Sequence, residues 1–233
     1  MVQHPKQQFI DMLVPTPHGS FAIEAAVAKQ PVKRGARKVP EELVRETIAG
    51  IPFYWQGYKQ VLNQTKSLEA IMADSGLQAF LKKYFYDLLL RRLNPEIFEV
   101  YMGEVGAHLE HRHNFGLDVA VFATSDLTGE KFDFKYLEVV PQLVIEVDMK
   151  VSLDGTGLVA FEDFLSLKTQ NLFNFGTKKL LWVLSKSKKV IVATPGEDWK
   201  IVDWNKDIEV WEGISINIGK HLKARGINPD IIL

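Results

Sequence analysis

Two acidic residues of this sequence stand where apolar side chains would be expected. Glu146 lies within the run LVIEV at 143–147, which predicts a strand that is buried on both faces. A carboxylate in such a strand is costly to bury unless a metal ion or a cationic side chain compensates its charge. Asp118 is likewise the single charged residue of a short strand predicted over 117–123. Both acids are therefore candidates for a functional site.

A lysine interrupts an apolar helix in the same part of the chain. The apolar residues that recur at helical spacing are Phe161, Phe164, Leu165, Leu172 and Phe175. Lys168 falls on this stripe, so we expect it to face the core. The alternative is that its long side chain extends past the core to solvent. Gly176 predicts the end of the helix and 178–183 a further strand, which makes a unit of strand, crossover helix and strand.

These residues have the chemistry of a phosphodiester hydrolase. Two carboxylates on neighbouring strands suit Mg²⁺ or Mn²⁺, and a lysine can position a water molecule or stabilise charge on a phosphate. Because strand side chains alternate, Asp148 and Lys150 are predicted on the face of Glu146, and Asp148 is a further candidate metal ligand. The alternative is a structural network of paired charges without activity.

Composition limits the classes of function. The chain has 233 residues and 46% apolar content, which is sufficient for one large domain with an appendage. A formal net charge of −1 excludes a global basic field, so binding to DNA would depend on local basic patches. Cysteine is absent, which excludes disulfides and thiol chemistry. No apolar segment resembles a signal peptide or reaches membrane-spanning length, so we expect a cytoplasmic protein without a membrane partner.

The chain is predicted to comprise an arm and one domain. Residues 1–39 are rich in proline, glycine and basic residues without sustained periodicity, which predicts a partly flexible arm before a domain over 40–233. A helix is predicted from Pro40 to about Ala49, and a strand or hairpin around Gly57. Ser75 is a candidate N-cap for a long helix that has Lys82 on its outer side. Strands are predicted over 97–102, 105–111 and 117–123, and three more follow the central unit.

The order of these motifs resembles a known family. The segments are RETIAG (45–50), LDVAVFA (117–123), PQLVIEV (141–147) and KTQNLFNFGTKKLLWVL (168–184). Together they are similar to a bacterial putative restriction endonuclease family, formerly a domain of unknown function, of the PD-(D/E)XK restriction-endonuclease-like superfamily. The resemblance covers about residues 41 to 219. It implies an α/β fold with a mixed central sheet flanked by helices, with Asp118 and Glu146 as metal ligands and Glu46 as a further acid from the first helix.

Two departures from the superfamily motif affect the expected site. Leu117 stands where the motif has its structural proline, and Asp148 stands where it has the catalytic lysine. Lys168 is our first candidate for the missing lysine and Lys150 the second. We therefore predict a Mg²⁺- or Mn²⁺-dependent endonuclease that acts on DNA. The alternative is a catalytically degenerate module that binds nucleic acid or protein. Cleavage of both DNA strands needs two sites, which a homodimer would supply.

Overall fold

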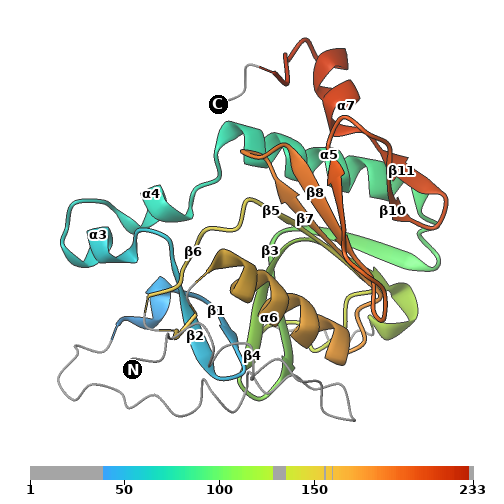
Figure 1. Ribbon diagram of the computed structural model, residues 1–233. Coiled ribbons are helices and arrows are strands. Elements are labelled where there is room, and N and C mark those ends of the chain that lie inside the picture. Colours follow the sequence, from blue (N-terminus) through green and yellow to red (C-terminus); the bar gives the residue numbers. More distant parts are fainter. Residues whose placement is uncertain (1–38, 128–134, 155, 159, 231–233) are drawn as a thin grey trace, which may run out of the picture.

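The computed structural model describes residues 39–127, 135–154, 156–158 and 160–230, and Figure 1 shows their arrangement. A nine-stranded mixed sheet has the order β6-β2-β1-β4-β5-β7-β8-β9, and β3 pairs with the other edge of β4. These strands are β1 (Val44–Ile48), β2 (Ile51–Trp55), β3 (Phe98–Glu110), β4 (His113–Ala123), β5 (Leu143–Val147), β6 (Val151–Ser152), β7 (Lys179–Leu184), β8 (Lys189–Ala193) and β9 (Lys200–Asp203). A two-stranded ribbon, β10 (Ile208–Trp211) and β11 (Ile214–Ile216), lies beside the sheet.

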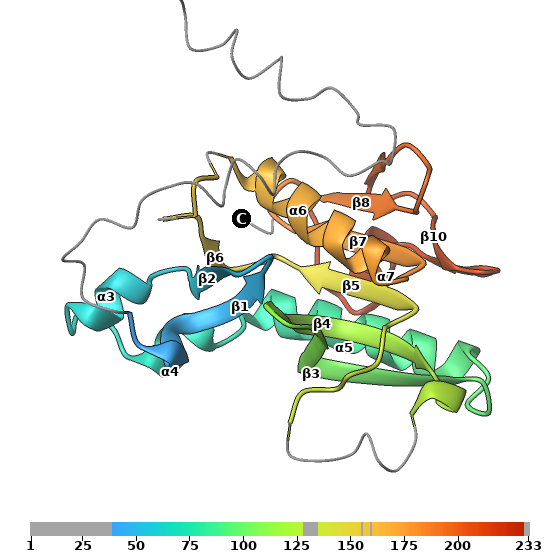
Figure 2. The same ribbon diagram turned by 90° about the horizontal axis from the view of Figure 1, so that it is seen from below.

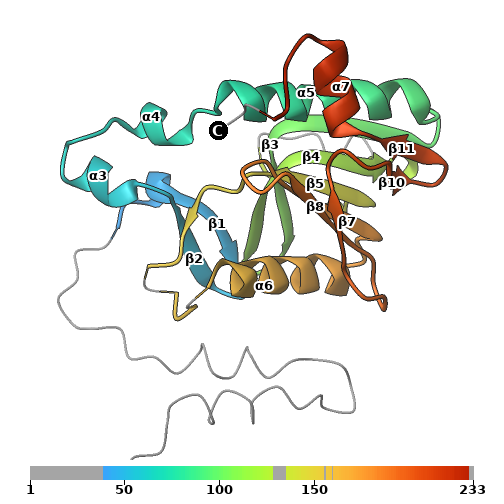
Figure 3. The ribbon, with the colours of Figure 1, turned by 45° about the horizontal axis from the view of Figure 1, so that its top comes forward.

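Helices cover both faces of the sheet. In Figure 3, α5 (Gly76–Arg92) and α7 (Ile218–Ala224) lie over one face and α6 (Phe161–Asn174) lies over the other. The short helices α3 (Tyr58–Leu62) and α4 (Leu68–Met72) lie next to β1 and β2, as Figure 2 also shows. Each face has its own apolar core, one that includes α5 and one that includes α6. The predicted mixed sheet flanked by helices is confirmed; the predicted arm, apart from residue 39, lies outside the described residues.

The central strand, helix and strand unit has the predicted form. Every residue of β5 is buried, and β7 runs parallel to it with Glu146 beside Trp182. The crossover helix α6 ends before Gly176, whose φ of 109° is readily available to glycine. The indole Nε1–H of Trp182 donates a hydrogen bond to Thr169 Oγ1 at 3.0 Å. This buried bond fixes the position of α6 along β7.

Helix α5 begins at the predicted cap. Ser75 and Gln78 form a reciprocal capping box, and the helix ends at Arg92, before Asn94. The prediction that Lys82 lies on the outer side is wrong. Lys82 is buried together with Gln78 and with apolar residues of α5 such as Phe85.

The first predicted helix is wrong in type. Only Glu41–Leu43 is helical, as one 3₁₀ turn, and β1 follows directly. Ala49 and Gly50 both have positive φ, at 52° and 77°, and this backbone suits the tight hairpin between β1 and β2. Three β-branched residues in VRETI favour a strand, and pairing with β2 outweighs the acidic helix-start signal. The predicted strand near Gly57 is present as β2, which ends at Trp55, whereas the predicted hairpin is wrong because Gly57 is the N-cap of α3.

The strand predictions before the central unit need one revision. The segments predicted as strands over 97–102 and 105–111 are one long strand, β3, with a register shift between Met102 and Val105. A β-bulge of this kind bends a strand and redirects its side chains. Beyond the central unit, the three predicted strands are present as β8, β9 and β11; β10, which pairs with β11 in the separate ribbon, was not predicted.

Candidate active site

The candidate site lies where the sheet divides. On the edge of β4 that does not face β3, β1 pairs at Asn114 and β5 pairs from Val119 onward. The intervening part of β4 therefore has main-chain and side-chain groups that face a gap between two diverging strands. The two apolar cores change over at the same place, because Leu117 belongs to the core with α6 whereas Val119 belongs to the core with α5. Asp118 lies between these two residues. The alternation of side chains along a strand therefore does not predict which core Asp118 faces.

Lys168 joins the two glutamates that the sequence analysis singled out. Its Nζ lies 2.8 Å from Glu46 Oε2 and 2.9 Å from Glu146 Oε1. It also donates a hydrogen bond to the carbonyl oxygen of Gly116 at 3.1 Å. The side chains of all three charged residues are 0% exposed, so the alternative in which Lys168 extends to solvent is wrong. Three separate elements, β1, β5 and α6, thus bring their charges to one buried point.

The charges of this group are not balanced. Burial by itself disfavours the ammonium, but the Glu146 and Glu46 carboxylates outweigh that effect and raise the pKa of Lys168 above its ordinary value. Burial raises the pKa of Glu146 from 4.5 to about 8; Lys168 opposes this increase, whereas Asp118 and Glu46 add to it. The single ammonium of Lys168 does not fully compensate both carboxylates, and Arg45 adds only a smaller opposing effect on Glu146. A further positive charge at this point would therefore stabilise ionised Glu146.

Asp118 connects the two glutamates to a second set of charges. Its Oδ2 accepts a hydrogen bond of 2.7 Å from the main-chain N–H of Val147, the residue after Glu146. Its Oδ1 lies 2.9 Å from Lys82 Nζ and 3.6 Å from Arg45 Nη2. Arg45 in turn lies 3.0 Å from Glu104 Oε1. The predicted pair of acids therefore does converge, and it does so within a larger ionic network.

Sequence reasoning missed Arg45, Lys82 and Glu104. Lys82 could have been found by the rule that found Lys168, because it lies four residues after Gln78 and three before Phe85 on the buried face of α5. Arg45 precedes Glu46 on β1, but its prediction as part of a helix concealed the strand geometry. Glu104 had no sequence signal that we recognise, because the β-bulge that positions it is a feature of the tertiary pairing with β4.

Asp148 and Lys150 lie outside this network. β5 ends at Val147, and Asp148 has a φ of 47°, so strand alternation does not continue past Glu146. Asp148 Oδ1 accepts a hydrogen bond of 2.7 Å from Ser185 N–H, and Lys150 Nζ donates one of 2.6 Å to Ala73 O. Both residues line a cavity of about 670 Å³ beside the end of β5. Their predicted placement on the face of Glu146 is wrong.

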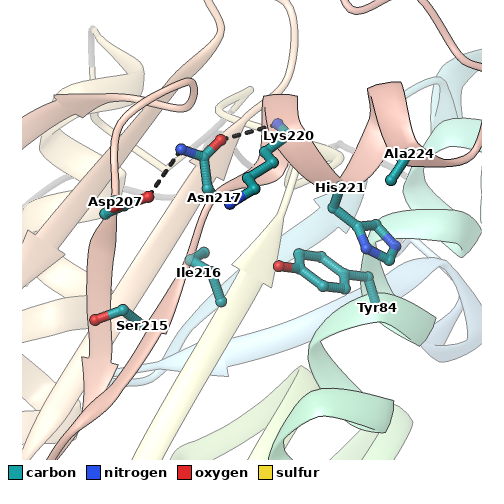
Figure 4. Close-up of a pocket in the computed structure, with 8 residues that line it drawn as sticks. All are labelled: Tyr84, Asp207, Ser215, Ile216, Asn217, Lys220, His221 and Ala224. Carbon is teal, nitrogen blue, oxygen red and sulfur yellow. Dashed lines mark hydrogen bonds between the residues drawn. The ribbon is translucent and has the colours of Figure 1, made fainter.

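A second cavity, of about 430 Å³, lies beside α7 and shares no residue with the ionic network. Figure 4 shows its lining, in which the Tyr84 and His221 rings stack with centroids 3.6 Å apart. Asn217 caps α7 by accepting a hydrogen bond from Lys220 N–H and donates one to Asp207. Burial and then the charge of Arg225 lower the pKa of His221. We assign these contacts to the packing of α7 on α5.

The network contains carboxylates, the kind of donor that a hard divalent cation takes. Within the described ranges, no three histidine, aspartate or glutamate side chains are grouped as a complete ligand set for one ion. Mg²⁺, however, is commonly held by one or two carboxylates together with water and substrate phosphate. Glu146 Oε2 is buried and has no hydrogen-bond partner among the described residues, whereas Glu146 Oε1 and Asp118 Oδ1 are ion-paired with Lys168 and Lys82. The carboxylates present therefore fit such an ion, and Glu146 and Asp118 are the residues that would hold it.

Comparison with known proteins places the fold. No protein-family model and no curated protein sequence matches the chain. The structure is similar to a solved crystal structure from Anabaena variabilis ATCC 29413 that is described as "a putative nuclease belonging to DUF820". The two chains are 14% identical with a TM-score of 0.51, and the similarity covers 64% of this chain and 82% of the other. This protein therefore has the mixed α/β fold, a large sheet flanked by helices, of that solved structure.

Proposed function

We propose that this protein is a nuclease that hydrolyses DNA phosphodiester bonds with the help of Mg²⁺ or Mn²⁺. The observation that carries the proposal is the buried contact of Lys168 with Glu46 and Glu146, next to Asp118. The similarity to a solved protein described as a nuclease agrees with this reaction class. We also propose that the protein is a member of the bacterial family that its sequence motifs resemble.

Each residue has a distinct role in this proposal. Asp118 and Glu146 would hold the divalent ion, whose chemistry would be a more acidic bound water and compensation of charge on the scissile phosphate. Lys168 has an ammonium group with three donors, and its contacts with Glu46, Glu146 and Gly116 O fix its position. These three contacts engage all three donors, so Lys168 would position the attacking water only when one contact is exchanged for the water; Glu46 keeps Lys168 charged and oriented.

A second candidate function is a catalytically degenerate module that binds nucleic acid or protein through the same region. The specific observation that favours it is the neutralisation of Asp118 by the protein itself. Lys82 lies 2.9 Å from Asp118 Oδ1, and only 6% of the Lys82 side chain is exposed. A permanent cation at this carboxylate would compete with a divalent ion.

The two functions are separated by incubation of the purified protein with supercoiled plasmid, with and without Mg²⁺ or Mn²⁺. A nuclease should produce nicked and linear DNA in the presence of the ions and none in EDTA. Glu146→Gln and Lys168→Met should each lower the rate by two or more orders of magnitude, since each removes a group in contact with the reacting atoms. Unchanged plasmid under all ionic conditions would support the degenerate module.

No helix in the described part of the chain has both the length and the apolar character needed to cross a membrane. Cytoplasmic localisation and a homodimer that places one site on each DNA strand remain part of the proposal.

A further inference from the structure

Two almost fully buried cations lie beside Asp118. The Arg45 and Lys82 side chains are only 4% and 6% exposed, and both approach Asp118 Oδ1. The Arg45 guanidinium lies over the Trp55 ring at 4.4 Å from its centroid, which fixes its plane. Its Nε is buried and makes no hydrogen bond within the described residues. Arginine in this state can donate further hydrogen bonds to an oxyanion, and its planar fork matches a phosphate.

Two partly exposed acids pair with these cations. Asp74 Oδ2 lies 2.8 Å from Lys82 Nζ, and the Asp74 side chain is 32% exposed. Glu104 alone of the two acids reaches Arg45. Its Oε1 lies 3.0 Å from Arg45 Nη2 and 3.8 Å from Lys82 Nζ, and its side chain is 36% exposed. Exposure therefore falls from Glu104, through Arg45 and Lys82, to Asp118 at 1%. This gradient identifies the side from which a substrate phosphate would approach the buried acids.

The backbone holds Glu104 in an unusual conformation. Glu104 has a φ of 58° and follows Gly103 at 102°, within the register shift between Met102 and Val105. A non-glycine residue with positive φ is uncommon and persists where the surrounding structure requires it. The bulge directs the carboxylate of Glu104 toward Arg45, away from the regular side-chain direction of β3.

We propose that Arg45 and Lys82 form the subsite for a nucleic-acid phosphate, and that Glu104 occupies this subsite in the free protein. A carboxylate and a phosphate diester each present two oxygens to an arginine fork, so one can replace the other. Displacement of Glu104 by the substrate would open the route to Asp118 and Glu146. This inference rests on the proposed nuclease function and adds the element that admits the substrate.

The test measures DNA binding in EDTA, so that cleavage does not contribute. A 5′-labelled duplex oligonucleotide is titrated with wild type, Glu104→Gln and Glu110→Gln, with fluorescence anisotropy as the readout. Glu110 ends the same strand and is exposed, so its variant changes net charge equally without freeing Arg45. We expect Glu104→Gln to bind at least five-fold more tightly than Glu110→Gln. Equal affinities of the two variants, or no binding by any protein at low salt, would overturn the inference.

Gly116→Ala provides a variant that keeps every charge. A Cβ at this position would lie 2.8 Å from Glu104 Oε2, at the end of a flexible side chain, so it should displace that carboxylate. The φ of Gly116 is not in the left-handed region, so the backbone tolerates alanine at this position. We expect tighter DNA binding than wild type, together with a melting temperature that shows an intact fold. Binding equal to wild type would contradict the displacement of Glu104 by phosphate.

Arg45→Lys tests the arginine while it retains the charge. In the Glu104→Gln background it should abolish most of the gain in affinity, because lysine lacks the planar fork. Cleavage of plasmid is scored separately. If the protein cleaves plasmid efficiently with metal ions, but its DNA affinity is unchanged in the Glu104 and Arg45 variants, this inference is overturned and the proposed nuclease function stands. If Glu104→Gln binds DNA more tightly but no protein cleaves plasmid, the phosphate subsite stands and the proposed nuclease function is overturned.

Discussion

Lys168 is the residue on which the buried charges of the site depend. It is fully buried, and it is the ammonium in contact with both Glu46 and Glu146. A lysine in an apolar environment would ordinarily lose its proton, but these two carboxylates keep it charged. The energetic consequence is asymmetric, because the removal of the lysine leaves two acids close together in the core.

Lys168→Met should therefore destabilise the protein as well as remove cleavage. We expect a loss of about 3 kcal/mol in the free energy of unfolding, typical of a buried ion pair that loses one partner. Urea unfolding measures this loss. Adding Glu146→Gln to Lys168→Met should restore part of it above about pH 8, where Glu146 would otherwise be ionised. Lys150→Met is the control, because Lys150 contacts Ala73 O and lies outside the network. If Lys168→Met were as stable as wild type, Lys168 would not be compensating the buried charges of Glu46 and Glu146.

Glu146 should make stability depend on pH. Burial raises its pKa from 4.5 to about 8, so the folded protein retains a proton that the unfolded chain releases across this window. The free energy of unfolding therefore falls as pH rises from about 4.5 to about 8. Glu146→Gln keeps the neutral shape, and it should lose this slope and exceed wild-type stability at pH 9. Urea unfolding at several pH values measures the slope, with Glu110→Gln as the control. If the free energy of unfolding changes with pH in the same way for wild type and Glu146→Gln, the pKa of Glu146 is not raised.

At the scale of elements, the site depends on how α6 lies against β7. Lys168 can reach Glu46 and Glu146 only if the crossover helix has a fixed position along the sheet. The hydrogen bond from Trp182 to Thr169, the residue next to Lys168, supplies that constraint. Both partners are buried, so neither can replace the bond with water.

Thr169→Val should cost about 1–3 kcal/mol of stability, because it leaves a buried indole N–H without a partner. Trp182→Phe removes the other partner and has an additional packing cost. A double-mutant cycle isolates the pair, and we expect the double variant to be more stable than the sum of the single changes predicts. Plasmid cleavage should fall in Thr169→Val, because Lys168 loses its fixed position. Additive stabilities would show that the bond does not position the helix.

At the scale of the whole molecule, the division of the sheet assembles the site. β1 and β5 leave the same edge of β4 at different points, and the acids of all three strands meet at the gap between them. Helices from both faces contribute, with Lys82 from α5 and Lys168 from α6. Any ion that binds the gap would therefore connect both layers of the fold.

Mn²⁺ should accordingly raise the melting temperature of the folded protein. We expect an increase of several degrees for wild type at pH 8, and a smaller one at pH 6, where the ion must displace a proton from Glu146. Asp118→Asn should lose the increase, whereas Asp148→Asn should retain it, because Asp148 binds Ser185 N–H outside the gap. Equal increases in wild type and Asp118→Asn would exclude the proposed metal ligands.

Local sequence patterns are sufficient to predict the central unit and most of the charged residues in it. A fully apolar strand with one acid, and an apolar helix stripe with one lysine, are local patterns, and the structure places Glu146 and Lys168 as those patterns predicted. Tertiary structure decided the rest. Pairing with β2 turned the expected first helix into a strand, the end of β5 turned Asp148 away, and a bulge directed Glu104 to Arg45. These outcomes depend on strand partners far apart in the sequence, and local periodicity contains no information about such partners.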